Sequence, residues 1–206
     1  MIAIEEIRRS LRGAWALAAG REDWRENFDF SADGFFKSFW AMPLGLPLTL
    51  FSTAVFSTVV QNLLMQSDSA AAREAAANAP SLSKSLAIAG VSYFVEWALA
   101  LFIMVAVARF LQVSQYIAIL INAYNWTRLL ILLISAVPSA LYAVGLRSEL
   151  LFIMLLTAIG IWSLIVLWRT IRRGLDIAPG QATAMMLLVV LASVLFNFGA
   201  GSLLDG

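Results

Sequence analysis

Residues Ser85–Val144 read SLAIAGVSYFVEWALALFIMVAVARFLQVSQYIAILINAYNWTRLLILLISAVPSALYAV, and this stretch decides the fold of the chain. It contains two apolar runs, each long enough to cross a bilayer as a helix, which takes about 20 residues. Glu96 and Arg128 are the charged side chains inside these runs. A charge at the middle of a bilayer costs roughly 3 kcal/mol, so it usually faces a partner or a water-filled cavity. The stretch therefore predicts a membrane protein with a polar centre.

The composition points to the same class of protein. Of the 206 residues 61% are hydrophobic and 13% are charged, whereas a soluble globular chain carries about 25% charged residues. Histidine and cysteine are absent, which removes thiol and imidazole catalysis, disulfides and the common zinc, copper, haem and iron–sulfur ligand sets. We therefore predict no enzyme activity, no catalytic residue, no metal site and no cofactor. No basic groove with interleaved aromatic residues is evident, so nucleic acid is not a predicted partner.

Residues 1–35 form the predicted cytoplasmic N-terminal segment. Apolar side chains recur in it at helical spacing, and charged residues fill the opposite face. The apolar set is Ile4, Ile7, Leu11, Ala14, Trp15 and Ala18. The pattern predicts an amphipathic helix of roughly 15 residues at the membrane surface, or equally a helix packed on the protein's own loops. Ser31 and Asp33 mark the next helix start, because such side chains accept from the free N–H groups of a first turn.

Residues 36–206 form the predicted membrane domain. Five apolar segments are expected to span the bilayer, at about residues 38–66, 86–108, 117–145, 150–168 and 182–204. Pro43 and Pro47 predict a fixed bend near the start of the first span. A run of alanines that ends at Pro80 predicts a short surface helix in the longest connection. The fold class is therefore all-α, a polytopic membrane protein with five transmembrane helices plus an N-terminal amphipathic surface helix.

Basic residues are distributed unequally between the two sides of these spans. Ten Lys and Arg fall on the side of the N-terminus and three on the other side. The positive-inside rule then places the N-terminus in the cytoplasm and the C-terminus in the periplasm. Arginine outnumbers lysine twelve to two, which hints at a GC-rich bacterial genome. The predicted location is therefore the bacterial inner (plasma) membrane, as a multi-pass protein.

The two intramembrane charges are predicted to lie at similar depth on antiparallel helices. A hydrogen-bonded ion pair between Glu96 and Arg128 would lower the cost of burying both charges. Asn122 and Asn125 precede Arg128 at i, i+3, i+6 spacing, which predicts one polar face. The pair either fixes helix register or forms a polar site for a proton, an ion or a lipid headgroup. A third interpretation puts residues 114–126 at the interface, with Arg128 reaching the headgroups and Glu96 alone and protonated.

Three arginines, Arg169, Arg172 and Arg173, close the fourth span. They are predicted to be a topology signal or to hold an anionic lipid headgroup. The predicted partners are accordingly the lipid bilayer, a bound anionic lipid, and other membrane-protein subunits or a second copy of this chain.

The layout resembles the Yip family of five-span membrane proteins, in particular its bacterial members. The resemblance is carried by the basic end of the fourth span, IWSLIVLWRTIRRGL at 161–175, and by the turn into a small-residue-led last span, PGQATA at 179–184. It covers roughly residues 85–204 and implies five spans after a cytosolic N-terminal part. Eukaryotic members bind small GTPases and carry a short Asp-Leu-Tyr-Gly-Pro-like motif. That motif has no counterpart here, so GTPase binding is not implied.

Two functions are compatible with these features. The first is a non-enzymatic accessory, assembly or scaffold subunit that packs against other membrane proteins. The alternative is a small transporter or lipid-handling protein that uses the intramembrane Glu96 and Arg128 as its polar site.

Overall fold

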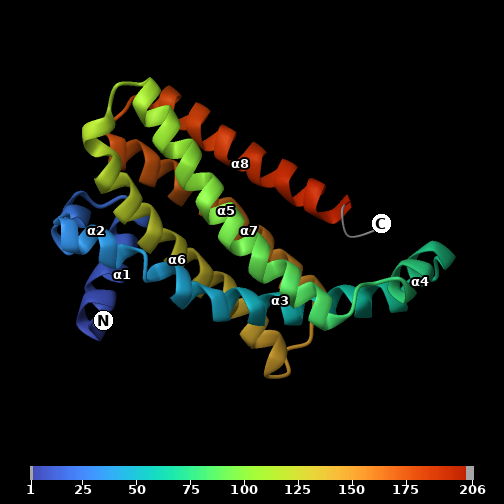
Figure 1. The fold of residues 1–206 in the computed structure, drawn as a ribbon. Helices are drawn as coiled ribbons and strands as arrows, with labels where there is room; N and C mark the ends of the chain where they lie inside the picture. The colour runs from blue at the N-terminus through green and yellow to red at the C-terminus, as the bar shows by residue number, and fades with distance from the viewer. Residues whose placement is uncertain (1, 203–206) are drawn as a thin grey trace.

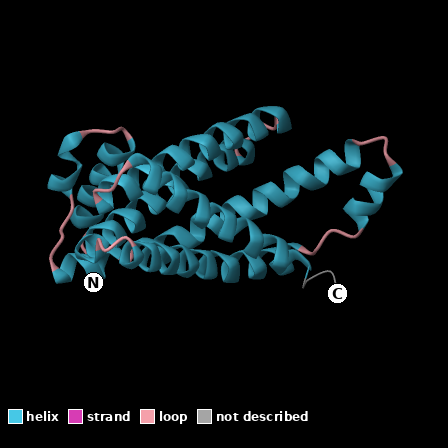
Figure 2. Ribbon diagram, turned by 90° about the horizontal axis from the view of Figure 1, so that it is seen from above, coloured by secondary structure: helices cyan, strands magenta, loops and turns pink. Residues whose placement is uncertain are grey.

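The computed structural model describes residues 2–202 of the chain, and the side chains of residues 2–199. Within this part every regular element is a helix (Figure 2). Five of the helical segments are long and apolar enough to cross a membrane. The chain is therefore an all-α integral membrane protein with five spans, as predicted.

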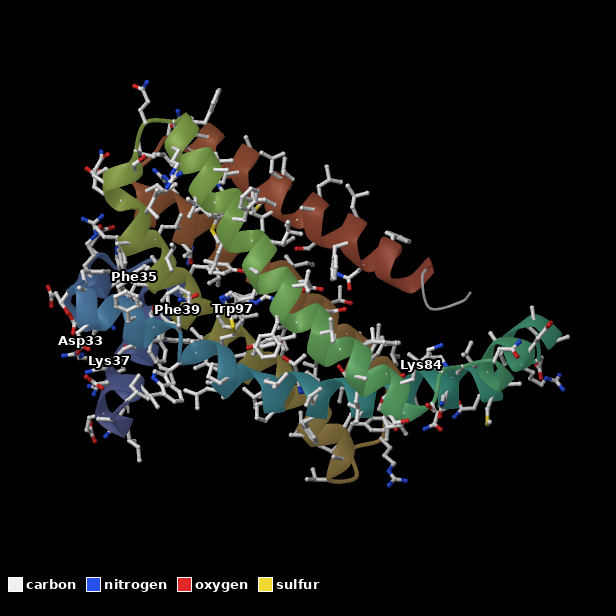
Figure 3. All side chains as sticks on the ribbon, viewed as in Figure 1. Asp33, Phe35, Lys37, Phe39, Lys84 and Trp97 are labelled. Carbon is white, nitrogen blue, oxygen red and sulfur yellow. The ribbon has the colours of Figure 1, made fainter. Side chains whose placement is uncertain are left out.

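The N-terminal segment contains three short helices. They are α1 (Ile4–Ala18), the 3-10 helix η1 (Glu22–Asn27) and α2 (Ala32–Ser38). The predicted helix start at Ser31 is confirmed, because its side-chain oxygen accepts from the backbone N–H of Gly34 at 3.1 Å. Lys37 ties α2 to α1 through Glu6 at 2.7 Å and also pairs with Asp33 at 2.8 Å. Asp33 and Lys37 lie at the outer edge of this end of the molecule (Figure 3).

The membrane domain consists of five long helices and two short ones. The long helices are α3 (Ala41–Gln66), α5 (Leu82–Phe110), α6 (Ile117–Ala143), α7 (Glu149–Leu175) and α8 (Pro179–Ser202). The short ones are α4 (Ala70–Ala77), which is the alanine run, and the 3-10 turn η2 (Ser114–Tyr116). Helix α4 projects beyond the end of the bundle (Figure 1). The predicted end of the fifth span, at residue 204, lies outside the described residues.

Helix ends and predicted span ends differ most at α7. The fourth span was expected to stop at Trp168, ahead of the basic residues, but the helix continues to Leu175. Because a long arginine side chain can extend its charge away from the apolar region, a helix can continue past the end of its apolar span with arginines in its last turns. Asp176 ends α7 in the left-handed conformation, with φ 54°.

The five long helices are arranged as a closed ring. Helix α3 packs against α5 and α6, α6 packs against α7, α7 against α8, and α8 returns to α5. Helices α5 and α6 follow each other in sequence, but their backbones approach closely at few points, and they meet mainly through long side chains. Helix α1 and the end of α8 lie at opposite ends of the bundle (Figure 1), as an odd number of spans requires.

The close contact of α3 with its two neighbours depends on Gly45. A Cβ atom at this position would lie 2.4 Å from the hydroxyl oxygen of Tyr93 on α5 and 2.7 Å from Leu132 on α6. Tyr93 donates from this position to the carbonyl of Met42 at 2.7 Å, inside the proline-containing start of α3. Small residues allow backbones to approach in this way in membrane proteins, where packing replaces the hydrophobic effect as the driving force.

Candidate functional site

The two predicted intramembrane charges meet inside the ring. Glu96 lies at the midpoint of α5, and its Oε2 is 3.4 Å from Nη2 of Arg128 on α6. About a quarter of each side chain is exposed, 22% for Glu96 and 25% for Arg128. Arg128 is therefore directed across the ring toward a carboxylate, and Glu96 is not alone. The separation is long for a charge-assisted hydrogen bond, which is usually 2.7–2.9 Å.

Asn197 of α8 is the closer partner of Glu96. Its Nδ2 donates to Oε1 of Glu96 at 2.7 Å and also to the carbonyl of Ser193 at 2.8 Å. In the sequence Asn197 lies in the second half of the last span, and no signal links it to α5. The two residues are 101 positions apart, and only the packing of α8 onto α5 brings them together.

Trp97 and Tyr124 form the aromatic side of the site. The guanidinium carbon of Arg128 lies 5.4 Å from the centre of the Trp97 ring, within the range of a cation–π interaction. Nη1 of Arg128 donates to the hydroxyl of Tyr124 at 3.3 Å. The two rings pack edge to face with their centroids 6.4 Å apart. Nε of Arg128 is buried and has no hydrogen-bond partner among the described residues.

Asn125 supports this site through its contact with Trp97 and does not line the site. It is fully buried, accepts from the indole N–H of Trp97 at 2.9 Å and donates to the hydroxyl of Ser38 at 2.9 Å. Ser38 donates in turn to the carbonyl of Phe35 at 2.7 Å. This chain of hydrogen bonds orients the Trp97 ring on which Arg128 is stacked. Asn125, predicted as a neighbouring polar group of the site, therefore acts by positioning a site residue.

Asn122 faces the N-terminal segment. Its Nδ2 donates to the backbone carbonyl of Asp29 at 2.7 Å, while its Oδ1 is buried without a partner. A step of three residues turns a helix by about 60°, so Asn122 and Arg128 point about 120° apart. That rotation agrees with the third of the helix circumference that the spacing predicted, but it is enough for the two side chains to face different neighbours, and Asn122 does not line the polar site.

A cavity of about 350 Å³ surrounds the polar centre, close to the lower end of the size range of small-molecule sites. Aliphatic side chains from α6, α7 and α8 form most of its wall. The polar groups that line it are Glu96, Tyr124, Thr127, Arg128, Ser163, Ser193 and Asn197. The cavity is therefore amphiphilic, because it combines polar groups from four helices with aliphatic side chains.

The arginines at the end of α7 make contacts with α1 that the sequence did not predict. Arg169 donates to the carbonyl of Ala18, and Arg173 donates to the carbonyls of Gly20 at 2.9 Å and Arg21 at 2.6 Å. These carbonyls lie at or just after the end of α1, where cations are favourable for the helix dipole. Arg172 instead lies over the ring of Trp168 at 5.2 Å. Two of the three arginines thus hold α1 against α7.

Among the described residues no group of three or more acidic side chains has the arrangement of a metal site. Comparisons of the chain with models of protein families, with curated proteins and with solved structures find no match. The resemblance to the Yip family therefore stays a prediction.

Proposed function

We propose that this protein binds an amphiphilic molecule of the lipid class inside its ring of helices, with the polar head at Arg128, Glu96 and Asn197. The observation that carries this proposal is the incomplete hydrogen bonding of Arg128. Its Nε is buried without a partner, and its nearest carboxylate is 3.4 Å away. Buried polar groups are nearly always satisfied. The guanidinium lines the cavity, so an acceptor supplied by a ligand there would add to the long hydrogen bonds that its two Nη groups make with Tyr124 and Glu96.

The composition of the cavity supports an amphiphile over a hydrated ion. A path for a hydrated ion needs a continuous polar lining, whereas aliphatic side chains such as Leu164, Leu167 and Val190 interrupt the polar lining of this cavity. The head of the ligand would be a hydrogen-bond acceptor such as a carboxylate, because Arg128 supplies donors. Asn197 donates to Oε1 of Glu96, which is the oxygen that Arg128 does not contact. The proposed activity is binding or transfer of the ligand, without catalysis.

The alternative role as an accessory or scaffold subunit stays a prediction. Its support was the large apolar surface of the spans. Exposed side chains such as Phe102 and Leu195 do cover the long helices, but contact with lipid requires the same surface. The surface therefore does not favour a protein partner over the bilayer, whereas the cavity favours a ligand.

We also propose that the end of the bundle with α1 faces the cytoplasm of a bacterial cell. This end carries Arg109 at the end of α5 and the three arginines of α7, in addition to the arginines of α1. The positive-inside rule then supports an N-terminus inside and a C-terminus outside.

Photolabelling with a diazirine fatty acid tests the proposed ligand class. The full-length protein in nanodiscs should be labelled on α6 and α8, and free palmitate should compete whereas hexadecane, which has no polar head, should not. Arg128→Leu should lower the specific labelling several-fold, while Arg172→Leu, which removes an arginine outside the cavity, should leave it unchanged. Equal competition by hexadecane and palmitate would show that the cavity holds acyl chains without using its polar centre, and the proposal would then be abandoned.

A further inference from the structure

Helix α1 uses two different faces. Its small residues, among them Ser10, Gly13 and Ala14, are buried against η1, α6 and α7. Leu17 is buried with them, but two other large apolar side chains point elsewhere, and Ile4 remains 81% exposed and Trp15 54% exposed. The amphipathic stripe that the sequence shows is therefore only partly covered by the protein. An exposed stripe of this kind is typical of a helix that lies in the membrane interface.

The contacts of α1 place it beside the C-terminal part of α7. Trp15 packs on Trp162 of α7, with ring centroids 6.5 Å apart, while Ala18 is held by Arg169. Trp162 precedes Arg169 by two turns of the same helix, which is about 10 Å along the axis. The C-terminal half of α1 thus lies next to the segment of α7 where the apolar span gives way to basic residues. Lipid headgroups and the first part of their acyl chains occupy this depth.

A groove of about 700 Å³ runs along the exposed face of α1. Apolar side chains of α1 and Leu130 of α6 line one part of it, and arginines line the other. Arg21 is paired with Asp23 at 2.5 Å. Arg8 and Arg12 are one helical turn apart, and neither has a hydrogen bond or ion pair within the described residues. The groove therefore joins two uncompensated positive charges to an apolar surface.

We infer that this groove is a binding site for an anionic phospholipid of the leaflet at the α1 end. The phosphate is held by Arg8 and Arg12, and an acyl chain lies on Leu11, Trp15 and Leu130. The charge of the groove is complementary to an anionic head, and its apolar part fits a lipid but not free phosphate. The site is separate from the cavity around Glu96, so the inference does not depend on the proposed function and is tested independently of it.

Native mass spectrometry of the intact protein tests this site. The protein is extracted from vesicles of phosphatidylglycerol and phosphatidylethanolamine, and bound phosphatidylglycerol is counted. The double variant Arg8→Gln/Arg12→Gln should bind it roughly tenfold or more weakly, because each basic side chain near an anionic surface strengthens binding about fivefold. The control Arg9→Gln/Arg25→Gln removes the same charge outside the groove and should bind as the wild type does.

Two further measurements make the outcome decisive. Trp15→Ser should weaken phosphatidylglycerol binding while leaving both arginines in place. Inorganic phosphate at millimolar concentration should not displace the lipid. Equal losses in the two double variants would show a general charge effect, and displacement by inorganic phosphate would show an anion site without lipid contact. Either result would overturn the inference.

Discussion

Asn197 donates a 2.7 Å hydrogen bond to Glu96, and this contact joins the last span to the second where α8 closes the ring. Asn197→Ala should therefore loosen α8 and lower the free energy of unfolding by about 0.5–2 kcal/mol, the range of hydrogen bonds between membrane helices. Unfolding in mixed micelles would measure the change. In a Glu96→Ala background the same substitution should cost much less; an identical cost in both backgrounds would show that the bond contributes nothing.

Asn125 should matter more for stability than its small size suggests. Asn125→Ala leaves the buried indole N–H of Trp97 without an acceptor and removes the donor to Ser38. Each orphaned buried group costs about 1–3 kcal/mol, so a clear loss of thermal stability is expected. Thr183→Ala is the matched control, because it removes the acceptor of an exposed indole N–H, that of Trp168, and should change little. Equal losses in the two variants would contradict the argument.

Gly45 should tolerate no side chain. In Gly45→Ala the new methyl group would meet the hydroxyl of Tyr93 at 2.4 Å, and such overpacking costs about 1–3 kcal/mol. Gly160→Ala, where nothing lies within 4 Å, should be neutral or slightly stabilising, since alanine is the better helix former. Thermal unfolding of both variants in the same detergent makes the comparison. Adding Tyr93→Phe to Gly45→Ala should restore part of the stability, and no restoration would place the strain elsewhere.

Acid should release α1 from α2. The hydrogen bond from Lys37, together with that from the backbone N–H of Ala3, holds the pKa of Glu6 below its ordinary value of 4.5. Because the detached helix binds the proton more readily, the contact is fully present above pH 4.5 and is lost as the pH falls through the lowered pKa. The hydrogen-exchange protection factors of α1, which correct for the slower intrinsic exchange in acid, should therefore fall below pH 4.5. Glu6→Gln should remove this dependence and Glu5→Gln should not.

The orientation of the protein in the membrane can be determined with single cysteine substitutions, because the natural chain contains no cysteine that would react as well. Glu5→Cys on α1 and Arg73→Cys on α4 lie at opposite ends of the bundle. A membrane-impermeant thiol reagent added to intact cells should label Arg73→Cys alone, and Glu5→Cys should react only after the membrane is opened. Labelling of Glu5→Cys in intact cells would reverse the proposed orientation.

The candidate site was only partly predictable. Glu96 and Arg128 could be found because a charge within an apolar run is conspicuous and costly. The separate roles of Asn122 and Asn125 could not be found from their spacing, because spacing defines relative direction on a helix but not the neighbour that each direction meets. Asn197 and Tyr124 carried no signal, since a single amide or phenol in a span is common.

The sequence by itself determined that the chain lies in the membrane, which segments cross it and which end is basic. Hydropathy suffices for this, because a bilayer imposes an apolar length of about 20 residues on every helical span. The tertiary structure alone decided that α5 and α6 are held apart, that α8 closes the ring onto Glu96, and that Arg169 and Arg173 hold α1. The reason is that surfaces facing lipid and surfaces facing protein are equally apolar. Close backbone contacts and a few hydrogen bonds, and not hydrophobicity, select the neighbours.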